Sequence, residues 1–257
     1  MIALLLAIPA AAQRLETEMP RMPDGKPNLT GLWQTFGSAY WDIQDHSASE
    51  GHFFELGAIG AIPAGQGIVV GNDIPYLPEA LAQKQNNYDN RLANDPMLKC
   101  FMPGVPRSTY MPFPFQIIQG TDQILIAYEF ATANRIVRVD SDSVSPVDSW
   151  MGWSNAAWQG DTLVIDVTGF NGDAWFDHMG NYASNQLHVI ERYTMVSPNH
   201  IEYEATLEDP TIFSEPWTIR LPLYRRVEDN AKLLEFKCVE FTEEKLYGDL
   251  QRQTGQE

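Results

Sequence analysis

Apolar and polar residues alternate in a series of short segments between Phe115 and Val239, and turn residues separate these segments. Over residues 201–208 every odd position is apolar and every even position is polar or charged. A period of two residues is typical of a strand that is buried on one face. Each join contains the Gly, Asn, Asp or Pro that tight turns require. This half of the chain is therefore restricted to a sheet made of consecutive hairpins.

The predicted strands must bury their apolar faces, and closure into a barrel also removes the exposed sheet edges. We therefore expect an all-β fold, an antiparallel meander that closes into a lipocalin-like barrel; a β-sandwich is the alternative. One helix is predicted at 78–92, lying against the sheet, and this helix and long loops are expected to cover one barrel end. The predicted strands cover residues 31–35, 68–70, 115–119, 123–130, 134–140, 156–159, 162–168, 187–194, 201–208, 217–223 and 232–239.

The ends of the chain and its cysteines bear on where the protein works. Residues 1–12 resemble a truncated signal peptide, with a short apolar run followed by small residues. Residues 13–30 are predicted to form an extended arm, and residues 31–257 a single barrel-like domain. We expect export to the periplasm or the exterior, where Cys100 and Cys238 would form a disulfide; two buried thiols are the alternative.

The net charge of -17 restricts the possible partners. An acidic surface repels phosphate backbones and anionic lipid heads, so nucleic acid is not expected as a partner. The apolar run near the start is shorter than the ~20 residues that span a bilayer, so stable membrane insertion is not expected. The chain has no glycine-rich phosphate-binding pattern and no GxSxG elbow, and no cofactor is predicted.

Several motifs follow one another in a characteristic order: DGKPNLTGLW, CFMPGVPRSTYMPFPFQI, WQGDTLVIDVTGFN, SNQLHVIERY, YEATLEDP, PWTI and EFKCVE. Together they resemble a large family of exported, β-rich bacterial proteins over most of the chain. The resemblance implies export and a β-rich fold, and it transfers no catalytic residue. Members often carry histidines around positions 182 and 183, where this chain has Tyr182 and Ala183.

One connection, residues 170–186 (FNGDAWFDHMGNYASNQ), is much longer than a hairpin requires. Long loops in compact domains are usually functional or disordered, and the aromatic residues here argue against disorder. We expect this loop to fold over a pocket at the barrel mouth. Asp177 and His178 lie in its middle, and His188 begins the next predicted strand.

His188 is the predicted general acid or base, because its reference pKa is near 6.5. Asp177 is expected to orient the ring of His188 or His178. Glu129 is the predicted second carboxylate; the alternative is a structural ion pair with Arg135. The strand over 187–194 has two faces of similar polarity, so at least one of its charged groups is expected to point into the barrel.

Further side chains are predicted to complete the pocket. In the proline-rich loop, Arg107 suits a carboxylate or phenolate ligand, and Tyr110 is expected to donate a hydrogen bond to the substrate. The predicted substrate-binding residues are Arg107, Trp175, Trp153, Tyr128 and His178. The segment DHSASEGHFFE contains Asp45, His46, Glu50, His52 and Glu55, but its spacing matches no metal-binding motif, and no metal is predicted.

Two functions fit these predictions. The first is a cofactor-independent lyase, dehydratase or isomerase that moves protons on a small hydrophobic or aromatic molecule. The second is a non-catalytic extracytoplasmic carrier with the same pocket; an accessory protein would instead show a large apolar surface patch. Convergence of His188, Asp177 and Glu129 in one apolar cavity favours the enzyme, and their separation favours the carrier.

Overall fold

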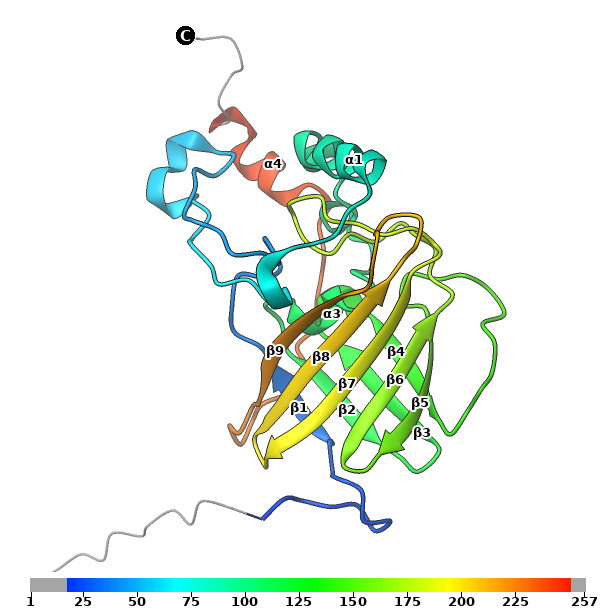
Figure 1. Cartoon of the computed structure of the whole chain (residues 1–257). Helices are drawn as coiled ribbons and strands as arrows, with labels where there is room; N and C mark the ends of the chain where they lie inside the picture. The colour runs from blue at the N-terminus through cyan, green and yellow to red at the C-terminus, as the bar shows by residue number, and fades with distance from the viewer. Residues whose placement is uncertain (1–17, 251–257) are drawn as a thin grey trace, which may run out of the picture.

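Nine strands close a barrel in the computed structural model of the chain, which describes residues 18–250 (Figure 1). Each strand pairs with the next along the chain, and the last strand returns to the first. The expected all-β barrel is confirmed, and the sandwich alternative is wrong. The strands are β1 (Gly31–Gln34), β2 (Phe115–Gln119), β3 (Gln123–Tyr128), β4 (Asn134–Val139), β5 (Trp153–Gln159), β6 (Thr162–Thr168), β7 (His188–Ser197), β8 (His200–Glu208) and β9 (Trp217–Arg225).

One pairing is parallel, so the sheet is not the uniform antiparallel meander that the sequence predicts. β4 and β5 run in the same direction, with Val137 opposite Ser154 and Val139 opposite Ala156. Parallel neighbours need a long return connection. Residues 140–152 provide it, and they carry the chain back to the barrel end from which β4 started.

The predicted strand at 232–239 is wrong, because β1 already occupies the place beside β9. Trp33 pairs with Arg225 and Gln34 with Tyr224, which closes the barrel. The chain after β9 leaves the sheet. The predicted strand at 68–70 is reduced to a single bridge between Val69 and Ile219, followed by a 3-10 turn at Val70–Asn72.

Helices gather at one end of the barrel in Figure 1, as expected. They are α1 (Pro78–Asp89), α2 (Arg91–Asn94), α3 (Arg107–Tyr110) and α4 (Thr242–Tyr247), with 3-10 segments at Phe54–Ile59, Pro96–Lys99, Phe130–Thr132 and Gly248–Leu250. All four residues of α3 are buried, so α3 closes this end of the barrel from within. The predicted helix at 78–92 breaks at Asn90, between α1 and α2.

α1 packs against the long loop rather than against the sheet. Leu81 is 53% exposed, whereas Ala80 and Asn87 are buried. Asn87 donates a hydrogen bond from its side-chain nitrogen to the carbonyl oxygen of Gly180 at 3.2 Å. The helix therefore contributes to holding the long loop in place.

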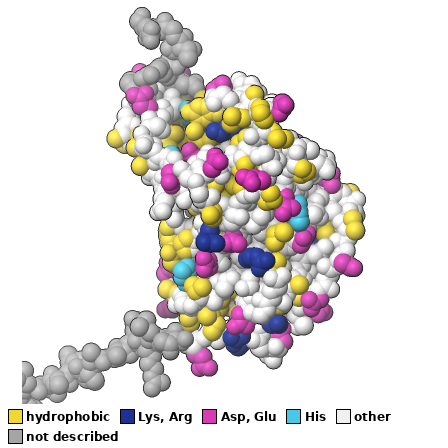
Figure 2. All heavy atoms as spheres, viewed as in Figure 1, with side chains coloured by type: hydrophobic (Ala, Val, Ile, Leu, Met, Phe, Trp, Pro, Cys, Tyr) yellow, Lys and Arg dark blue, Asp and Glu magenta, His cyan; other side chains and the backbone are white. Residues whose placement is uncertain are grey.

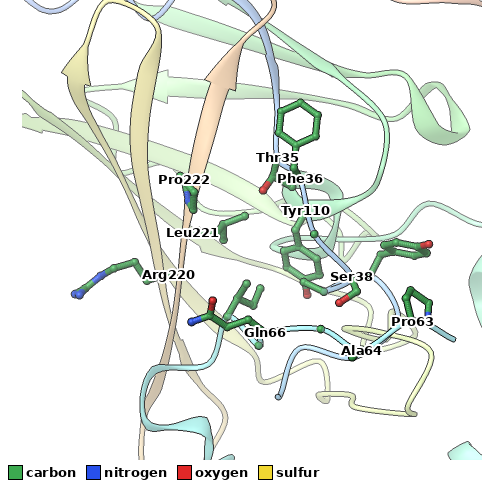
Figure 3. Close-up of a pocket in the computed structure, with 16 residues that line it drawn as sticks. Thr35, Phe36, Ser38, Pro63, Ala64, Gln66, Tyr110, Arg220, Leu221 and Pro222 are labelled. Carbon is green, nitrogen blue, oxygen red and sulfur yellow. The ribbon is translucent and has the colours of Figure 1, made fainter. Parts of the chain in front are cut away.

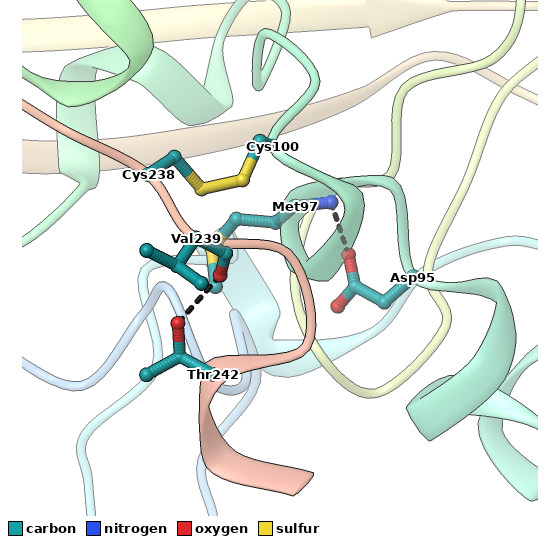
Figure 4. Close-up of a disulfide and its surroundings, with 6 residues drawn as sticks. All are labelled: Asp95, Met97, Cys100, Cys238, Val239 and Thr242. Atoms are coloured by element: carbon teal, nitrogen blue, oxygen red, sulfur yellow. Dashed lines mark hydrogen bonds between the residues drawn. A yellow bond between two sulfur atoms is a disulfide. The ribbon is translucent and has the colours of Figure 1, made fainter. Parts of the chain in front are cut away.

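The predicted disulfide between Cys100 and Cys238 is present (Figure 4). It joins the 3-10 segment Pro96–Lys99 to the chain that follows β9. Near it the backbone N–H of Phe241 donates to the carbonyl oxygen of Leu98 at 2.9 Å. The C-terminal segment is thereby fixed beside the barrel end that carries the helices.

The outer surface and the N-terminal part complete the description. Acidic and hydrophobic side chains are interspersed on the face shown in Figure 2. Residues 1–12 lie outside the described part of the chain. Within the arm, the described residues 18–30 pack against the barrel, because Leu29 is fully buried and Arg21 pairs with Asp161 at 2.7 Å. No helix between residues 18 and 250 combines the length and apolar character needed to cross a bilayer.

Candidate functional site at the barrel end

The long loop folds down onto the barrel end, and Asp177 organises it. The Asp177 carboxylate has no exposure to solvent and accepts hydrogen bonds from the backbone N–H groups of Ile43 (3.1 Å), Met179 (2.9 Å) and Asn181 (3.2 Å). The side-chain amide of Asn181 donates to it at 2.6 Å. Burial raises the pKa of Asp177 to about 7, and the charge of Asp42 acts in the same direction. These four hydrogen bonds tie the loop to itself and to residue 43, and none of them comes from a histidine ring, so Asp177 holds the loop.

His178 is oriented by a carboxylate that the sequence analysis did not select, Asp95. The two side chains are buried, and His178 Nδ1 lies 2.5 Å from Asp95 Oδ2. Asp95 precedes Pro96 and accepts from the backbone N–H of Met97 at 2.9 Å, as a helix-capping residue does (Figure 4). Its place in the Asn-Asp-Pro sequence indicated only the end of a helix, which is why its second role was missed.

Arg107 is the third buried side chain of this group, and it contacts Asp95. Its Nη1 lies 3.5 Å from Asp95 Oδ1, and the Arg107 side chain is 1% exposed. Burial opposes ionisation of Asp95, but the charge of Arg107 and the hydrogen bond with His178 together hold the pKa of Asp95 below its ordinary value. Burial lowers the pKa of His178, against the opposing effect of Asp95. At neutral pH the ring is therefore neutral, and a proton on Nδ1 is the tautomer that can donate to Asp95.

His178 and Asp95 both line a pocket of about 130 Å³. Its walls include the aromatic rings of Tyr40 and Trp41, and Trp41 lies with its ring centroid 4.6 Å from that of His178. Glu243 of α4 reaches the same pocket. The pocket is therefore lined by a histidine that a carboxylate holds at Nδ1.

Arg91 and His52 form a second polar pair in the wall of this pocket. Arg91 Nε donates to His52 Nε2 at 2.9 Å, and the guanidinium of Arg91 also donates to the carbonyl oxygen of Tyr88 at 2.6 Å. Burial lowers the pKa of His52 to about 4, and the positive charge of Arg91 acts in the same direction. His52 is therefore neutral, and Arg91 provides the positive charge on this wall.

A larger cleft, of about 580 Å³, is shown in Figure 3. Tyr40 lines both this cleft and the His178 pocket. The cleft exists because β1 and β9 pair only at their last residues and then diverge. Leu221 and Pro222 line one side of it, and Tyr110 lies at its base. Proline lacks a donor and suits this unpaired edge of β9.

Tyr110 contributes its ring rather than its hydroxyl to this cleft. The hydroxyl donates to the carbonyl oxygen of Phe176 at 2.8 Å, inside the protein. Burial raises the pKa of Tyr110 well above its ordinary value. Tyr110 is therefore a neutral donor that is already engaged, rather than a group free to polarise a substrate.

The structure places His188 on the outer face of the barrel wall, so it does not point into the pocket predicted at the barrel mouth. His188 Nε2 lies 2.9 Å from Asp166, and Nδ1 lies 3.4 Å from Glu208. Strand residues alternate between faces, and on β7 the inward face carries Val189, Glu191 and Tyr193 instead. His188 and Asp177 therefore do not meet.

The charged group of this strand that points into the barrel is Glu191. The similar polarity of the two strand faces predicted one such group but did not identify it. Glu191 forms two contacts with Arg135, at 2.6 and 2.9 Å, and accepts from the Tyr203 hydroxyl at 2.8 Å. The alternative given for Glu129, an ion pair with Arg135, is wrong. Glu129 instead accepts from the backbone N–H of Leu234 at 2.8 Å, which fixes the chain after β9.

The remaining predicted ligand-binding residues are separated from one another. Trp153 lies on the outer surface, where Arg138 stacks on its ring at 3.4 Å. Trp175 is buried in the long loop, and its carbonyl oxygen lies 3.4 Å from Arg107 Nη1. Tyr128 is buried in the barrel beside Arg135. Of the predicted set, the structure brings together Arg107 and His178, with Trp175 and Asp177 next to them in the loop.

The possible metal ligands of residues 45–55 do not converge. Across residues 18–250, no three His, Cys, Asp or Glu side chains are arranged to hold a metal ion. His46 contacts Ser38 at 3.0 Å, and His52 contacts Arg91. Both histidines therefore have other partners.

Comparisons of this chain with protein-family models, with curated proteins and with solved structures found no significant match. The resemblance to exported bacterial proteins therefore stays a prediction from the motifs.

Proposed function

We propose that this protein is a cofactor-independent acid–base enzyme, a lyase, dehydratase or isomerase, with His178 in the place that the sequence analysis gave to His188. The observation that carries the proposal is the buried contact of 2.5 Å between His178 and Asp95, in the lining of a pocket. A carboxylate that fixes one imidazole nitrogen leaves the other oriented for proton transfer.

In this proposal His178 is the general base. The neutral ring accepts a proton from the substrate at Nε2, and Asp95 stabilises the imidazolium that forms. Because burial lowers the pKa of His178, the base is unprotonated at neutral pH and returns its proton readily. Arg107 keeps Asp95 ionised, so its part is to position the pair rather than to contact the substrate.

The pocket restricts the substrate. A space of about 130 Å³ with Tyr40 and Trp41 as walls fits one small ring or a short chain, in agreement with a hydrophobic or aromatic substrate. Arg91 and Glu243 in its lining have opposite charges, and Asp95 is paired with Arg107, so the pocket has no strong preference for an ion. A neutral molecule with one acidic C–H or O–H group is the best match.

The test compares two histidines. A thermal-shift screen with phenols and aryl ketones identifies compounds that bind, and NMR then follows their conversion. We expect His178→Asn to reduce turnover by about 10²–10⁴-fold, the usual contribution of a general base. His188→Asn is the matched control on the outer surface and should leave turnover unchanged. Unchanged turnover in His178→Asn would refute the proposal.

A second candidate function, a carrier of small hydrophobic molecules, is favoured by the cleft in Figure 3. Its volume of about 580 Å³ lies within the range of roughly 300–1,000 Å³ that is common for ligand pockets. The separation of His188, Asp177 and Glu129 also favours this function. A carrier binds compounds in the same screen without converting any of them, and Leu221→Arg weakens the binding.

We further propose that the protein works after export, in the periplasm or outside the cell. The disulfide between Cys100 and Cys238 supports this, because such bonds persist in oxidising compartments. The proposal is tested by fractionating cells that express the full chain and titrating thiols in each fraction. Protein found only in the cytosol with two free thiols would contradict it.

A further inference from the structure

Ser38 and His46 form a side-chain pair that the proposed acid–base site does not use. Ser38 Oγ lies 3.0 Å from His46 Nε2, and both side chains are half-buried. A serine hydroxyl that donates to a histidine nitrogen is the arrangement that activates serine as a nucleophile. In this pair the hydroxyl is the donor when the ring proton sits on Nδ1.

The backbone around the pair fixes both partners. The main chain of His46 exchanges two hydrogen bonds with Gly65, each of 3.0 Å. The carbonyl oxygen of Ser38 accepts from the backbone N–H of Trp41 at 2.8 Å, which closes the turn that carries Ser38. The hydroxyl and the imidazole are therefore presented by two anchored segments.

Gly65 leaves the room in which the pair meets. A Cβ atom at position 65 would overlap with both Ser38 Oγ and His46 Nε2. The backbone of Gly65 does not lie in the left-handed region, so another residue could adopt its conformation there. Glycine at this position is therefore needed to leave space for the contact between Ser38 and His46, and not to form a turn.

Ser38 of this pair lines the larger cleft, and neither Ser38 nor His46 lines the His178 pocket. Ser38 and Gly65 both line the cleft, and Figure 3 shows Ser38 beside it. The cleft walls include Phe36 and Leu221. The charged residue in the lining is Arg220, which pairs with Glu204 at 2.5 Å. A neutral, largely hydrophobic molecule suits this environment.

We propose that Ser38 is the nucleophile of a second site that transfers acyl groups from small neutral esters, with His46 as its base. Ser38 Oγ forms a bond to the ester carbonyl carbon while His46 Nε2 accepts the hydroxyl proton. The bond from that carbon to the alcohol oxygen breaks, and the leaving alcohol takes the proton from His46. Water then attacks the acyl-serine with His46 as base, which releases the acid and restores Ser38.

The experiment uses the full chain and two probes, phenylmethanesulfonyl fluoride and p-nitrophenyl butyrate. The sulfonyl fluoride should add one phenylmethanesulfonyl group at Ser38, located by peptide mass spectrometry, with loss of fluoride. Hydrolysis of p-nitrophenyl butyrate should fall to background in Ser38→Ala and by about 10²-fold or more in His46→Gln. Unmodified Ser38 in the wild-type protein, or equal hydrolysis by Ser38→Ala, would overturn the proposal.

Three further variants test the contact between Ser38 and His46 and its independence from His178. Gly65→Ala should lose labelling at Ser38 while circular dichroism shows a folded barrel, because only the contact is disturbed. Ser49→Ala changes an exposed serine outside the cleft and should keep full labelling. His178→Asn should also keep it, so failure of the acid–base proposal and failure of this one give different results. Labelling that persists in Gly65→Ala contradicts the assigned geometry.

Discussion

Arg135 and Glu191 carry opposite charges inside the barrel, where neither is in contact with water. Their side chains are 2% and 0% exposed. A buried pair of this kind stabilises little relative to apolar residues, but an unpaired buried charge costs a great deal. Tyr193 and Ser154 also contact Arg135, at 3.2 and 3.3 Å, so the pair is part of a larger polar network.

Removal of one partner should therefore lower the free energy of unfolding more than removal of both. We expect Arg135→Met to lower the free energy of unfolding by about 3–5 kcal/mol, because Glu191 is left buried and unpaired. The double variant Arg135→Met with Glu191→Leu should regain part of this loss. Urea unfolding followed by tryptophan fluorescence measures each value. A double variant that is less stable than either single one would contradict this account.

The lowered pKa of His52 makes the stability of the protein depend on pH. Its pKa is about 4 in the folded protein, below the ordinary value of 6.5. Between these values the unfolded chain binds a proton that the folded protein does not, so stability falls as the pH falls from 6.5 to 4. Urea midpoints across this window measure the effect. The difference between wild type and His52→Gln should change inside the window and stay constant above it.

Among the elements, the long loop and α1 depend on each other. Gly180 has φ of 80°, and a Cβ atom there would lie 2.8 Å from the carbonyl oxygen of Lys84 and 2.8 Å from the nitrogen of Tyr88. The loop can approach the helix this closely only where it has no side chain. The approach holds the loop that carries His178 against the barrel end.

Alanine at position 180 should separate the loop from α1, and Gly160 offers a matched control. Gly160 also has positive φ, at 62°, but a Cβ atom there meets nothing within 4 Å. Gly160→Ala should cost about 1–2 kcal/mol from backbone strain alone. Gly180→Ala should cost more and should also speed hydrogen exchange in residues 176–182. Equal effects of the two variants on exchange would argue against this docking role.

The strands also show where a local sequence pattern predicts the structure and where it does not. The bounds of β2 and β6 match the prediction, because Pro or Gly residues stand at both ends of each strand. The segment 232–239 has similar composition but finds no partner strand among the described residues. Pairing at the end of the chain is decided by which strand closes the barrel, and this information is not in the segment itself.

For the molecule as a whole, the disulfide joins parts that the barrel alone does not hold. Cys100 and Cys238 are separated by 138 residues. Closing a loop of this size stabilises a protein by about 4–5 kcal/mol in the chain-entropy model. The chain after β9 otherwise has contacts such as those of Leu234 with Glu129 and Phe241 with Leu98.

The variant Cys100→Ser with Cys238→Ser should lose about 4–5 kcal/mol of unfolding free energy, measured by urea denaturation. Limited proteolysis should then cut first between residues 226 and 250, while the barrel stays intact. Added reductant should give wild-type protein the same cleavage pattern. A first cut within the strands would indicate that the disulfide supports the barrel itself.

The sequence by itself predicted most of the strands and the turns between them, and it favoured a closed β architecture and a disulfide between the two cysteines. These follow from local alternation, from turn chemistry and from the small number of ways in which one-sided strands can be buried. It also identified the loop over 170–186 as a place where functional groups gather. It did not determine which histidine faces a pocket.

Only the tertiary structure decided the partners of the charged residues. Asp95 and His178 are separated by 83 residues, and Arg135 and Glu191 by 56 residues, yet each pair is in direct contact. A period of two assigns a side chain to one of two faces without saying which face is inside. That choice, and the partner found there, depend on strand register and on the fold of distant loops, which are properties of the closed barrel as a whole.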